Sequence, residues 1–379
     1  MPREIWVLGF VSMLMDMSSE LIHGLLPVFM VSALGASALA VGMVEGIAEA
    51  TALIAKVFSG ALSDHLGRRK ELAVLGYGLA ALSKPLFALA GGVDAVLVAR
   101  FMDRVGKGMR GAPRDAMIAD LVPASIRGAA YGLRQSLDTA GAFLGPLLAV
   151  VLISIWPGNY RRVFWFAAAP AVLAVALLVA GVREPAAASP AARTRSPLQW
   201  RKLRRLSAGY WRVVAVGAAF ALARFSEAFL ILRARQKGLP DAAAPLVLVV
   251  MNSVYAVAAY PAGKLADRVD RDSLLAGGLI LLLAADVTLA RAGGLASTAL
   301  GVALWGLHMG LTQGLLAAMV ADAAPADLRA TAFGVFNLAG GAAALAASAL
   351  AGLLWDKLGA AATFYAGAVF STAAMALLW

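Results

Sequence analysis

The chain has 379 residues, of which 61% are hydrophobic and only 15% are charged, and its mean hydropathy is +0.80. This small number of charged residues cannot cover the surface of a soluble protein of this length. The composition therefore indicates a membrane protein. The absence of Cys excludes disulfides and thiol chemistry. The net charge of +11 is distributed as membrane orientation requires, so no nucleic-acid partner is expected.

Hydropathy predicts twelve membrane-spanning helices. A spanning helix needs about 20 mostly apolar residues, and the segments found here are too long for the strands of a barrel. The first is expected to begin within "MPREIWVLGF" and not to be a removed signal peptide. The predicted fold class is therefore an all-α membrane protein. Its predicted helices are 5–33, 39–62, 72–91, 94–112, 127–153, 162–182, 207–232, 242–263, 273–292, 296–320, 328–354 and 359–378.

The Lys and Arg residues predict that both termini are cytoplasmic. With this orientation, and with residues at the ends of the spans counted with the adjoining loops, 18 basic residues fall in inner loops and tails, 7 in outer loops and 8 within the spans. Many of the inner ones belong to a basic linker, residues 183–206. The end of this linker, "WRKLRRL", is expected to form a short amphipathic helix on anionic headgroups.

Two sequence patterns recur at nearly the same spacing. "SGALSDHLGRR" (59–69) is echoed by "PAGKLADRVDR" (261–271) at an offset of 203, and "AMIADLVPASIRGAAYG" (116–132) by "AMVADAAPADLRATAFG" (318–334) at 202. The first match aligns Gly60 with Gly263, Asp64 with Asp267 and Arg68 with Arg271. The chain is therefore predicted to be two parallel six-helix repeats, 1–182 and 207–379, joined by the linker.

The fourth predicted helix contains the charged stretch "RFMDRVGKGMRGAPRD" (100–115). Its glycines, Gly106, Gly108 and Gly111, spell the dinucleotide-binding pattern GxGxxG. That site needs a preceding strand and an acid about 20 residues further on. The preceding residues continue at helical length, so the nucleotide-binding interpretation is excluded.

Ionisable side chains within the spans form stripes along single helix faces. Because charge is costly in hydrocarbon, such residues usually face a cavity or a partner. The stripes lie on helices 1, 4, 7 and 10 and consist of Asp16, Glu20 and His23; Arg100, Arg104 and Lys107; Arg224 and Glu227; and Trp305, His308 and Thr312. They predict a substrate cavity lined by these four helices.

Helix geometry places the first two stripes at matching depths. At about 1.5 Å per residue, Asp16 and Arg104 both lie near the midplane. We therefore expect Asp16 to pair with Arg104 and Glu20 to pair with Arg100. The remaining charges of the stretch, Arg110, Arg114 and Asp115, are assigned to a cytoplasmic loop.

Four further charges are expected to be structural or local. Arg134 and Asp138, four residues apart on helix 5, are expected to form an ion pair. Lys84 and Asp286 fall on supporting helices 3 and 9, and structural roles are favoured for both.

The repeats and motifs resemble the major facilitator superfamily over essentially the whole chain. "GALSDHLGRRK" (60–70) is similar to its motif A, G-x-L-a-D-r-x-G-r-k, and "RVGKG" (104–108) to motif B. "GAFLGPLLA" (141–149) is similar to the antiporter-associated motif C. "DRVGKGMRGAPRDAMIAD" resembles a bacterial subgroup of exporters similar to drug:proton antiporters. The motif residues are Gly60, Asp64, Gly67, Arg68, Gly141, Gly145 and Pro146, with Asp267 and Arg271 from the repeat.

The resemblance implies two pseudo-symmetric six-helix bundles that work by alternating access. It further implies a monomer in the bacterial inner membrane whose partners are a small-molecule substrate and the bilayer. No catalytic residue, metal or cofactor is expected, because the proton gradient supplies the energy. The motif A carboxylate of Asp64 is expected to hold the cytoplasmic side closed by accepting hydrogen bonds from a facing helix N-terminus.

The resulting hypothesis is proton-coupled export of a small amphipathic, anionic or zwitterionic organic molecule. Asp16 or Glu20 is expected to carry the proton, and Arg104 to set its affinity. A permanent ion pair between helices 1 and 4 is the structural alternative.

Three other functions stay open at this point. An uptake symporter for an anionic metabolite would use the same arginines, Arg100 and Arg104, as its clamp. A divalent-metal exporter would use Asp16, Glu20 and His23 as ligands, against the repulsion of the nearby arginines. An intramembrane enzyme or lipid scramblase is disfavoured, because neither HExxH nor GxSxG occurs.

Overall fold

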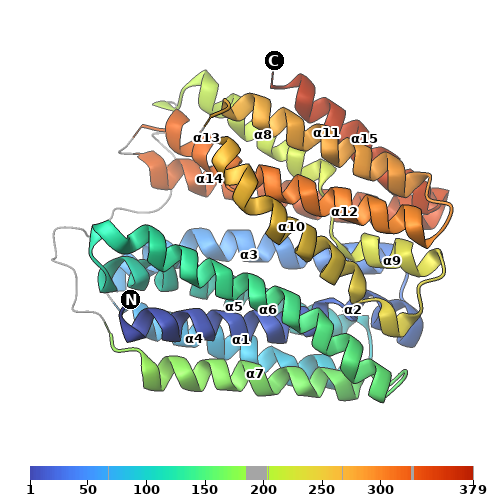
Figure 1. The fold of residues 1–379 in the computed structure, drawn as a ribbon, viewed down its shortest axis with the longest axis horizontal. Coiled ribbons are helices and arrows are strands. Elements are labelled where there is room, and N and C mark those ends of the chain that lie inside the picture. The colour runs from blue at the N-terminus through green and yellow to red at the C-terminus, as the bar shows by residue number, and fades with distance from the viewer. Residues whose placement is uncertain (67, 185–202, 204, 267, 326–327, 379) are drawn as a thin grey trace. The chain divides into compact units, whose positions relative to one another are not determined.

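The computed structural model describes residues 1–379 except 67, 185–202, 204, 267, 326–327 and 379, and it leaves the side chains of 61, 64–66, 124 and 330 undescribed (Figure 1). All regular elements in this part of the chain are helices, and no strand occurs there. The predicted amphipathic helix at the end of the linker falls mostly outside these residues.

All twelve predicted spans are confirmed as helical segments. In the first half they are α1 (Arg3–His23) continued by α2 (Leu26–Val28) and η1 (Phe29–Ala33), α3 (Ala38–Leu66), α4 (Arg69–Leu89), α5 (Val93–Leu121), α6 (Arg127–Ile155) and α7 (Tyr160–Gly181). In the second half they are α8 (Ala208–Ala223) with α9 (Ala228–Gln236), α10 (Leu246–Ala266), α11 (Arg271–Ala290), α12 (Leu295–Thr312) with α13 (Leu315–Ala323), α14 (Arg329–Leu358) and α15 (Ala360–Ala376).

Ten helical segments of the described chain are long and apolar enough to cross a bilayer. Of the other two, α15 is slightly short at 17 residues, and α5 is long enough but heavily charged. Large apolar side chains such as Leu82, Val257 and Val369 are mostly exposed, as expected for side chains that face lipid. These features describe a multi-pass membrane protein.

Helix α5 is longer than hydropathy predicts. Its predicted end was residue 112, but the helix continues to Leu121 and contains Arg110, Arg114 and Asp115. The assignment of these three residues to a loop was therefore wrong. Hydropathy falls where charges accumulate, whereas here the charges are satisfied by neighbouring helices, and Arg110 is 3% exposed.

Residue contacts divide the chain into two compact units. Unit 1 comprises Met1–Leu26 and Thr51–Pro197, and unit 2 comprises Pro27–Ala50 and Leu198–Trp379. Helix α3 thus contributes its first half to unit 2 and its second half to unit 1. The predicted bundles, 1–182 and 207–379, differ from these units in the segment 27–50.

The two units repeat the same helix pairings. In unit 1, α1 packs on α6 and α7, and α4 packs on α5 and α7. In unit 2, α8 packs on α14 and α15, and α11 packs on α12 and α15. Each helix of the second set follows its counterpart by one six-helix repeat, so the sequence duplication is also a duplication of packing.

Close helix contacts recur at an offset of 202 residues. A Cβ atom added at Gly76 would lie 2.8 Å from the backbone N of Arg110, and one added at Gly278 would lie 2.2 Å from Cγ2 of Thr312. Gly76 and Gly278 are 202 residues apart, and so are Arg110 and Thr312. Only glycine lets α4 and α11 approach α5 and α12 this closely.

A different pair of glycines brings α6 onto α1. A Cβ at Gly141 would lie 2.3 Å from the carbonyl O of Met13, and one at Gly145 would lie 2.6 Å from the carbonyl O of Met17. Both glycines belong to the motif C segment. Because the obstructing atoms are backbone atoms, no side-chain movement would relieve the clash.

We therefore expect Gly141→Ala to destabilise unit 1 although alanine favours helix formation. Overpacking of this kind costs about 1–3 kcal/mol in the free energy of unfolding, whereas the higher helix propensity of alanine contributes about 1 kcal/mol. Thermal unfolding of the detergent-solubilised protein measures the effect. Gly132→Ala on the same helix is the control, because a Cβ there meets nothing within 4 Å. Equal midpoints for the two variants would contradict the proposed contact.

Candidate functional site

The predicted charged stripes of helices 1 and 4 lie on α1 and α5, both in unit 1. Helices α4 and α6 flank them and contribute further charged residues. The charges form two clusters at different heights along α5. A single basic side chain, Lys107, lies between the clusters along the sequence of α5.

The first cluster centres on Asp103. Its carboxylate accepts a hydrogen bond from Lys84 Nζ at 2.7 Å, and Lys84 also donates to Ser19 Oγ at 2.9 Å. Arg100 and Arg104 each place a guanidinium nitrogen 3.9 Å from the same carboxylate. All four charged residues are buried. The pair therefore connects α4 to α5 and, through Ser19, to α1.

The second cluster surrounds Asp16. Arg110 Nη2 lies 3.2 Å from Asp16 Oδ1, and the Arg110 guanidinium stacks 4.8 Å from the centre of the Tyr77 ring. Arg114 donates to Ser12 at 3.0 Å. The predicted pairing of Asp16 with Arg104 is therefore wrong. The prediction failed because it assigned Arg110 and Arg114 to a loop. Both residues instead belong to α5, which places their side chains next to α1.

Helix α6 adds a carboxylate and a guanidinium to the second cluster. Arg134 forms the predicted ion pair with Asp138 one turn further on. Arg114 lies 3.9 Å from Asp138 and 3.1 Å from Asp115. The second cluster thus alternates acids and bases across α1, α5 and α6.

Glu20 belongs to neither cluster. Its carboxylate lies 3.2 Å from His23 Nδ1 on the next turn of α1, so its predicted pairing with Arg100 is also wrong. Its Cβ lies 2.9 Å from the position that a Cβ on Gly145 would take. The motif C glycine therefore seats α6 directly against the Glu20 turn.

Lys107 is the exposed cation of α5, whereas Arg100, Arg104 and Arg110 on the same helix are buried. Its ammonium group forms no ion pair with any described residue. It is near enough for its charge to act on both Asp16 and Glu20. A positive charge is thus exposed between two partly accessible carboxylates, which are 25% and 19% exposed.

The motif A region is only partly described. The side chain of Asp64 and the whole of Gly67 and Asp267 lie outside the described residues. A Cβ at Gly60 would lie 3.5 Å from Cβ of Ala112, and Ser59 Oγ donates to the carbonyl of Gly108 at 2.8 Å. The second half of α3 therefore packs closely on α5.

The arginines at the motif A ends make equivalent ion pairs in the two units. Arg69 pairs with Asp120, and Arg271 pairs with Asp322. Each residue of the first pair lies 202 residues before its counterpart in the second pair. The structural equivalent of Arg271 is therefore Arg69 and not Arg68, which the predicted alignment chose. Arg68 instead pairs with Glu71 at the surface.

In unit 2 the predicted cavity residues lie at a break between α8 and α9 and on α12. Arg224 and Glu227 flank the break and lie 3.4 Å apart. Trp305 and His308 are fully buried, and His308 Nδ1 lies 3.0 Å from the carbonyl of Gly278. Thr312 Oγ1 donates to the carbonyl of His308. These residues form part of the packing of unit 2, and their place in a substrate cavity stays a prediction.

Three of the four predicted cavity helices are interrupted. The first breaks between α1 and α2, the seventh between α8 and α9, and the tenth between α12 and α13, where Gly314 has a φ of +78°. Interrupted helices expose backbone groups, and a membrane protein tolerates them where they face protein or a water-filled cavity. Hydropathy did not reveal these breaks, because the apolar residues on both sides of each break keep the mean hydropathy of the whole segment high.

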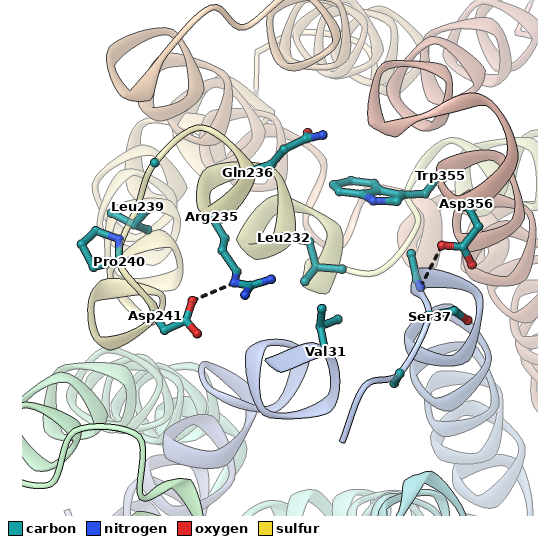
Figure 2. Close-up of a pocket in the computed structure, with 13 residues that line it drawn as sticks. Val31, Ser37, Leu232, Arg235, Gln236, Leu239, Pro240, Asp241, Trp355 and Asp356 are labelled. Atoms are coloured by element: carbon teal, nitrogen blue, oxygen red, sulfur yellow. Dashed lines mark hydrogen bonds and ion pairs between the residues drawn. The ribbon is translucent and has the colours of Figure 1, made fainter. Parts of the chain in front are cut away.

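A pocket of about 570 Å³ opens at one end of unit 2 (Figure 2). Its lining includes Val31, Ser37, Leu232, Arg235, Trp355 and Asp356. Arg235 donates to Asp241 at 2.7 Å, and the Asp356 carboxylate accepts from the backbone N–H groups of Ala38 and Leu39 at the start of α3. None of the predicted site residues lines this pocket.

The predicted metal-ligand set of Asp16, Glu20 and His23 does not converge. Asp16 is engaged by Arg110, and only Glu20 and His23 are in contact. Within the described ranges, no group of three or more His, Asp or Glu side chains is placed to hold a metal ion.

Comparison with known proteins agrees with the fold. The family model of the Major Facilitator Superfamily matches residues 8–348. An uncharacterized MFS-type transporter of Methanocaldococcus jannaschii is 32% identical, over 98% of this chain and 93% of that protein. The quinolone resistance protein NorA of Staphylococcus aureus is 25% identical over 185 residues, which are 49% of this chain and 46% of NorA.

Solved transporters share the architecture at low sequence identity. A POT family transporter in complex with a thioalcohol-conjugated peptide superposes with a TM-score of 0.82 at 14% identity, covering 100% of this chain and 95% of that chain. The human organic anion transporter MFSD10 gives 0.67 at 20% identity, with all of both chains covered. The duplicated six-helix packing, the motifs and the family match lead to one conclusion: the chain belongs to the Major Facilitator Superfamily and is a multi-pass membrane transporter.

Proposed function

We propose that this transporter is a proton-coupled exporter of small amphipathic organic molecules that carry an anionic or zwitterionic group. It would work in the bacterial inner membrane, with both termini in the cytoplasm and the proton gradient as its energy source. The observation that carries the proposal is the arrangement of two partly accessible carboxylates, Asp16 and Glu20, beside an exposed cation, Lys107.

The coupling would depend on exchange of partners around Asp16. While Asp16 is ionised, it holds Arg110 at 3.2 Å. A proton on Asp16 would weaken that pair and free Arg110 to move, while Asp138 on α6 keeps Arg114 and Arg134 beside it. Two arrangements of one network, selected by a proton, are what a coupled transporter requires.

Glu20 offers the second place for a proton. Its partner is the neutral or protonated imidazole of His23, and it sits where Gly145 packs α6 against α1. A change of charge at Glu20 would therefore act at a helix contact that has little room to adjust. Arg104, which was predicted to pair with Asp16 and to set the proton affinity, is held beside Asp103, so its role would be to fix the electrostatic field around α5 and not to move between acids.

The substrate class follows from the charge left open to solvent. Lys107 forms no ion pair with the described residues and lies between two acids, so a molecule with an acidic group could bind the ammonium while a basic group binds a carboxylate. Similarity to NorA over half the chain supports export of drug-like molecules.

An uptake symporter for an anionic metabolite is the alternative, since the same residues would serve uptake. The two differ in the direction in which a proton gradient drives the substrate.

Everted vesicles that are acidic inside test the coupling. With a pH-sensitive dye, addition of a transported compound should release protons in the wild type and should release none in Glu20→Gln or Asp16→Asn, whichever removes the proton carrier. Asp94→Asn, an exposed carboxylate at the start of the same α5, is the matched control and should behave as the wild type. Intact proton release in both variants would contradict proton transfer through α1.

Lys107→Gln tests the substrate class. Loss of a charge-assisted hydrogen bond, about 1.5–3 kcal/mol, should raise the KM for an anionic substrate about tenfold or more. Neutral and cationic compounds should be affected little. Lys357→Gln, an exposed lysine at the end of α14, controls for net charge. Equal losses for anionic and cationic compounds would count against an anion-binding role.

A further inference from the structure

Asp286 on α11 is the one carboxylate in unit 2 that is fully buried among the described residues. Both of its carboxyl oxygens are inaccessible, and neither has a hydrogen-bond partner in the described chain. Structural carboxylates in membrane helices normally have a basic partner. The structural role predicted for Asp286 therefore has no contact to support it.

The repeat explains why Asp286 is unusual. At the offset of 202 that relates the glycine contacts and the surface ion pairs, Asp286 is the equivalent of Lys84. The partner of Lys84 is Asp103, whose equivalent in unit 2 is Trp305. Unit 1 thus has an ion pair at 2.7 Å where unit 2 has a carboxyl group and an indole. The indole Nε1 of Trp305 is also buried without a partner.

The carboxyl group occupies space left by a glycine. A Cβ at Gly367 on α15 would lie 2.5 Å from Oδ2 of Asp286 and 3.0 Å from the Phe225 ring. Ser371, one turn further along α15, has a buried hydroxyl without a partner. The groups that these contacts place beside Asp286 are therefore the backbone of α15 and the ring of Phe225.

Charged and titratable groups on the helices that pack against α11 are engaged elsewhere. On α12, His308 places Nδ1 at the carbonyl of Gly278, eight residues or about 12 Å along α11 from Asp286, and its Nε2 is buried without a partner in the described chain. Arg233 on α9 donates to the carbonyls of Leu289 and Ala290 and to Gln236. The other such groups are Tyr365 on α15, exposed; Asp322 on α13, paired with Arg271; and Arg224 with Glu227, paired with each other.

We propose that Asp286 is a proton-binding site of unit 2 and holds its proton in the conformation described here. An ionised carboxylate at this position would lack both solvent and a counter-ion, whereas the neutral acid avoids most of that cost. The indole N–H of Trp305 and the hydroxyl of Ser371 also lack partners among the described residues, so water that enters this part of unit 2 could bind to them. Such water could exchange a proton with the carboxyl group of Asp286.

A series of aromatic contacts in unit 2 leads from the pocket toward Asp286. Phe225 contacts Phe364 and Phe229, and both of these contact Trp355, with ring centres between 5.6 and 6.3 Å apart. Trp355 in turn lines the pocket of Figure 2. These four aromatic residues form a continuous set of ring contacts from the pocket to Phe225, which lies against the same glycine, Gly367, as Asp286. Movement of these rings would admit water from the pocket to the carboxyl group.

Infrared spectroscopy of the purified full chain tests the site without any substrate. The difference between the wild type and Asp286→Asn at neutral pH should contain the C=O band of a protonated carboxylic acid, which moves to lower frequency in heavy water. Asp272→Asn, which changes a partly exposed carboxylate on the same helix that pairs with Arg212, should leave that band in place. A difference spectrum with carboxylate bands instead would overturn the proposal.

A second variant keeps the test valid if Asp286→Asn does not fold. Gly367→Ala places a methyl group against Oδ2, so it should shift the same acid band while leaving the residue itself intact. A band that does not respond to this change would not come from Asp286 and would overturn the proposal.

The part of Asp286 in transport rests on the proposed function. Asp286→Asn should retain substrate counterflow, which needs no proton gradient, and should lose at least tenfold in proton-driven accumulation. Asp272→Asn should retain both. Unchanged proton-driven accumulation in Asp286→Asn would overturn the coupling role. Failure of the proposed function would instead appear as absent proton release in the wild type, with the infrared band still present.

Discussion

Buried charge without water is the constraint on which unit 1 depends. A bilayer offers no solvent to α5, so each of its ionisable side chains must meet a partner on a neighbouring helix or reach an accessible surface. Asp103 meets Lys84 from α4, and Arg110 meets Asp16 from α1. The charges that make α5 unsuited to lipid are thus also its connections to α1, α4 and α6. Removal of one partner from such a pair leaves the other buried alone, which costs about 3–5 kcal/mol.

Duplication has preserved the packing of the two units while their chemistry diverged. Gly76 and Gly278 seat equivalent helix contacts, and the Arg69–Asp120 pair recurs as Arg271–Asp322. Within this common frame, the ion pair of Lys84 with Asp103 is replaced by Asp286 with Trp305. Unit 1 therefore holds its buried charges in ion pairs, whereas unit 2, built from the same repeat, has aromatic residues and one buried acid without a partner among the described residues. The repeats are therefore equivalent in packing but not in the buried charges that they carry.

The sequence predicted the architecture well, because length and hydropathy determine a membrane helix almost alone. All twelve helices, the duplication and the Arg134–Asp138 pair were correct. The pairings of Asp16 and Glu20 were wrong for different reasons: Asp16 pairs with Arg110, which had been assigned to a loop, and Glu20 pairs with His23 on its own helix. The ion pair of Asp103 with Lys84 depends on how α4 and α5 are rotated and how far each is inserted relative to the other. The helix breaks beside Arg224 and Gly314 likewise depend on the packing of neighbouring helices. No single-helix pattern contains that information.

The glycine contacts of α6 have a mechanical consequence. Gly141 and Gly145 lay the backbone of α6 against the carbonyls of Met13 and Met17, and the side-chain atom nearest to these two contacts is the Cβ of Glu20 at Gly145. A smooth contact resists separation through its closeness, yet it offers little friction to a small slide along the helix axis. Shear of this kind is how packed helices move without unpacking. A small slide of this kind would carry Asp16 and Glu20 along α6 without separating the two helix backbones.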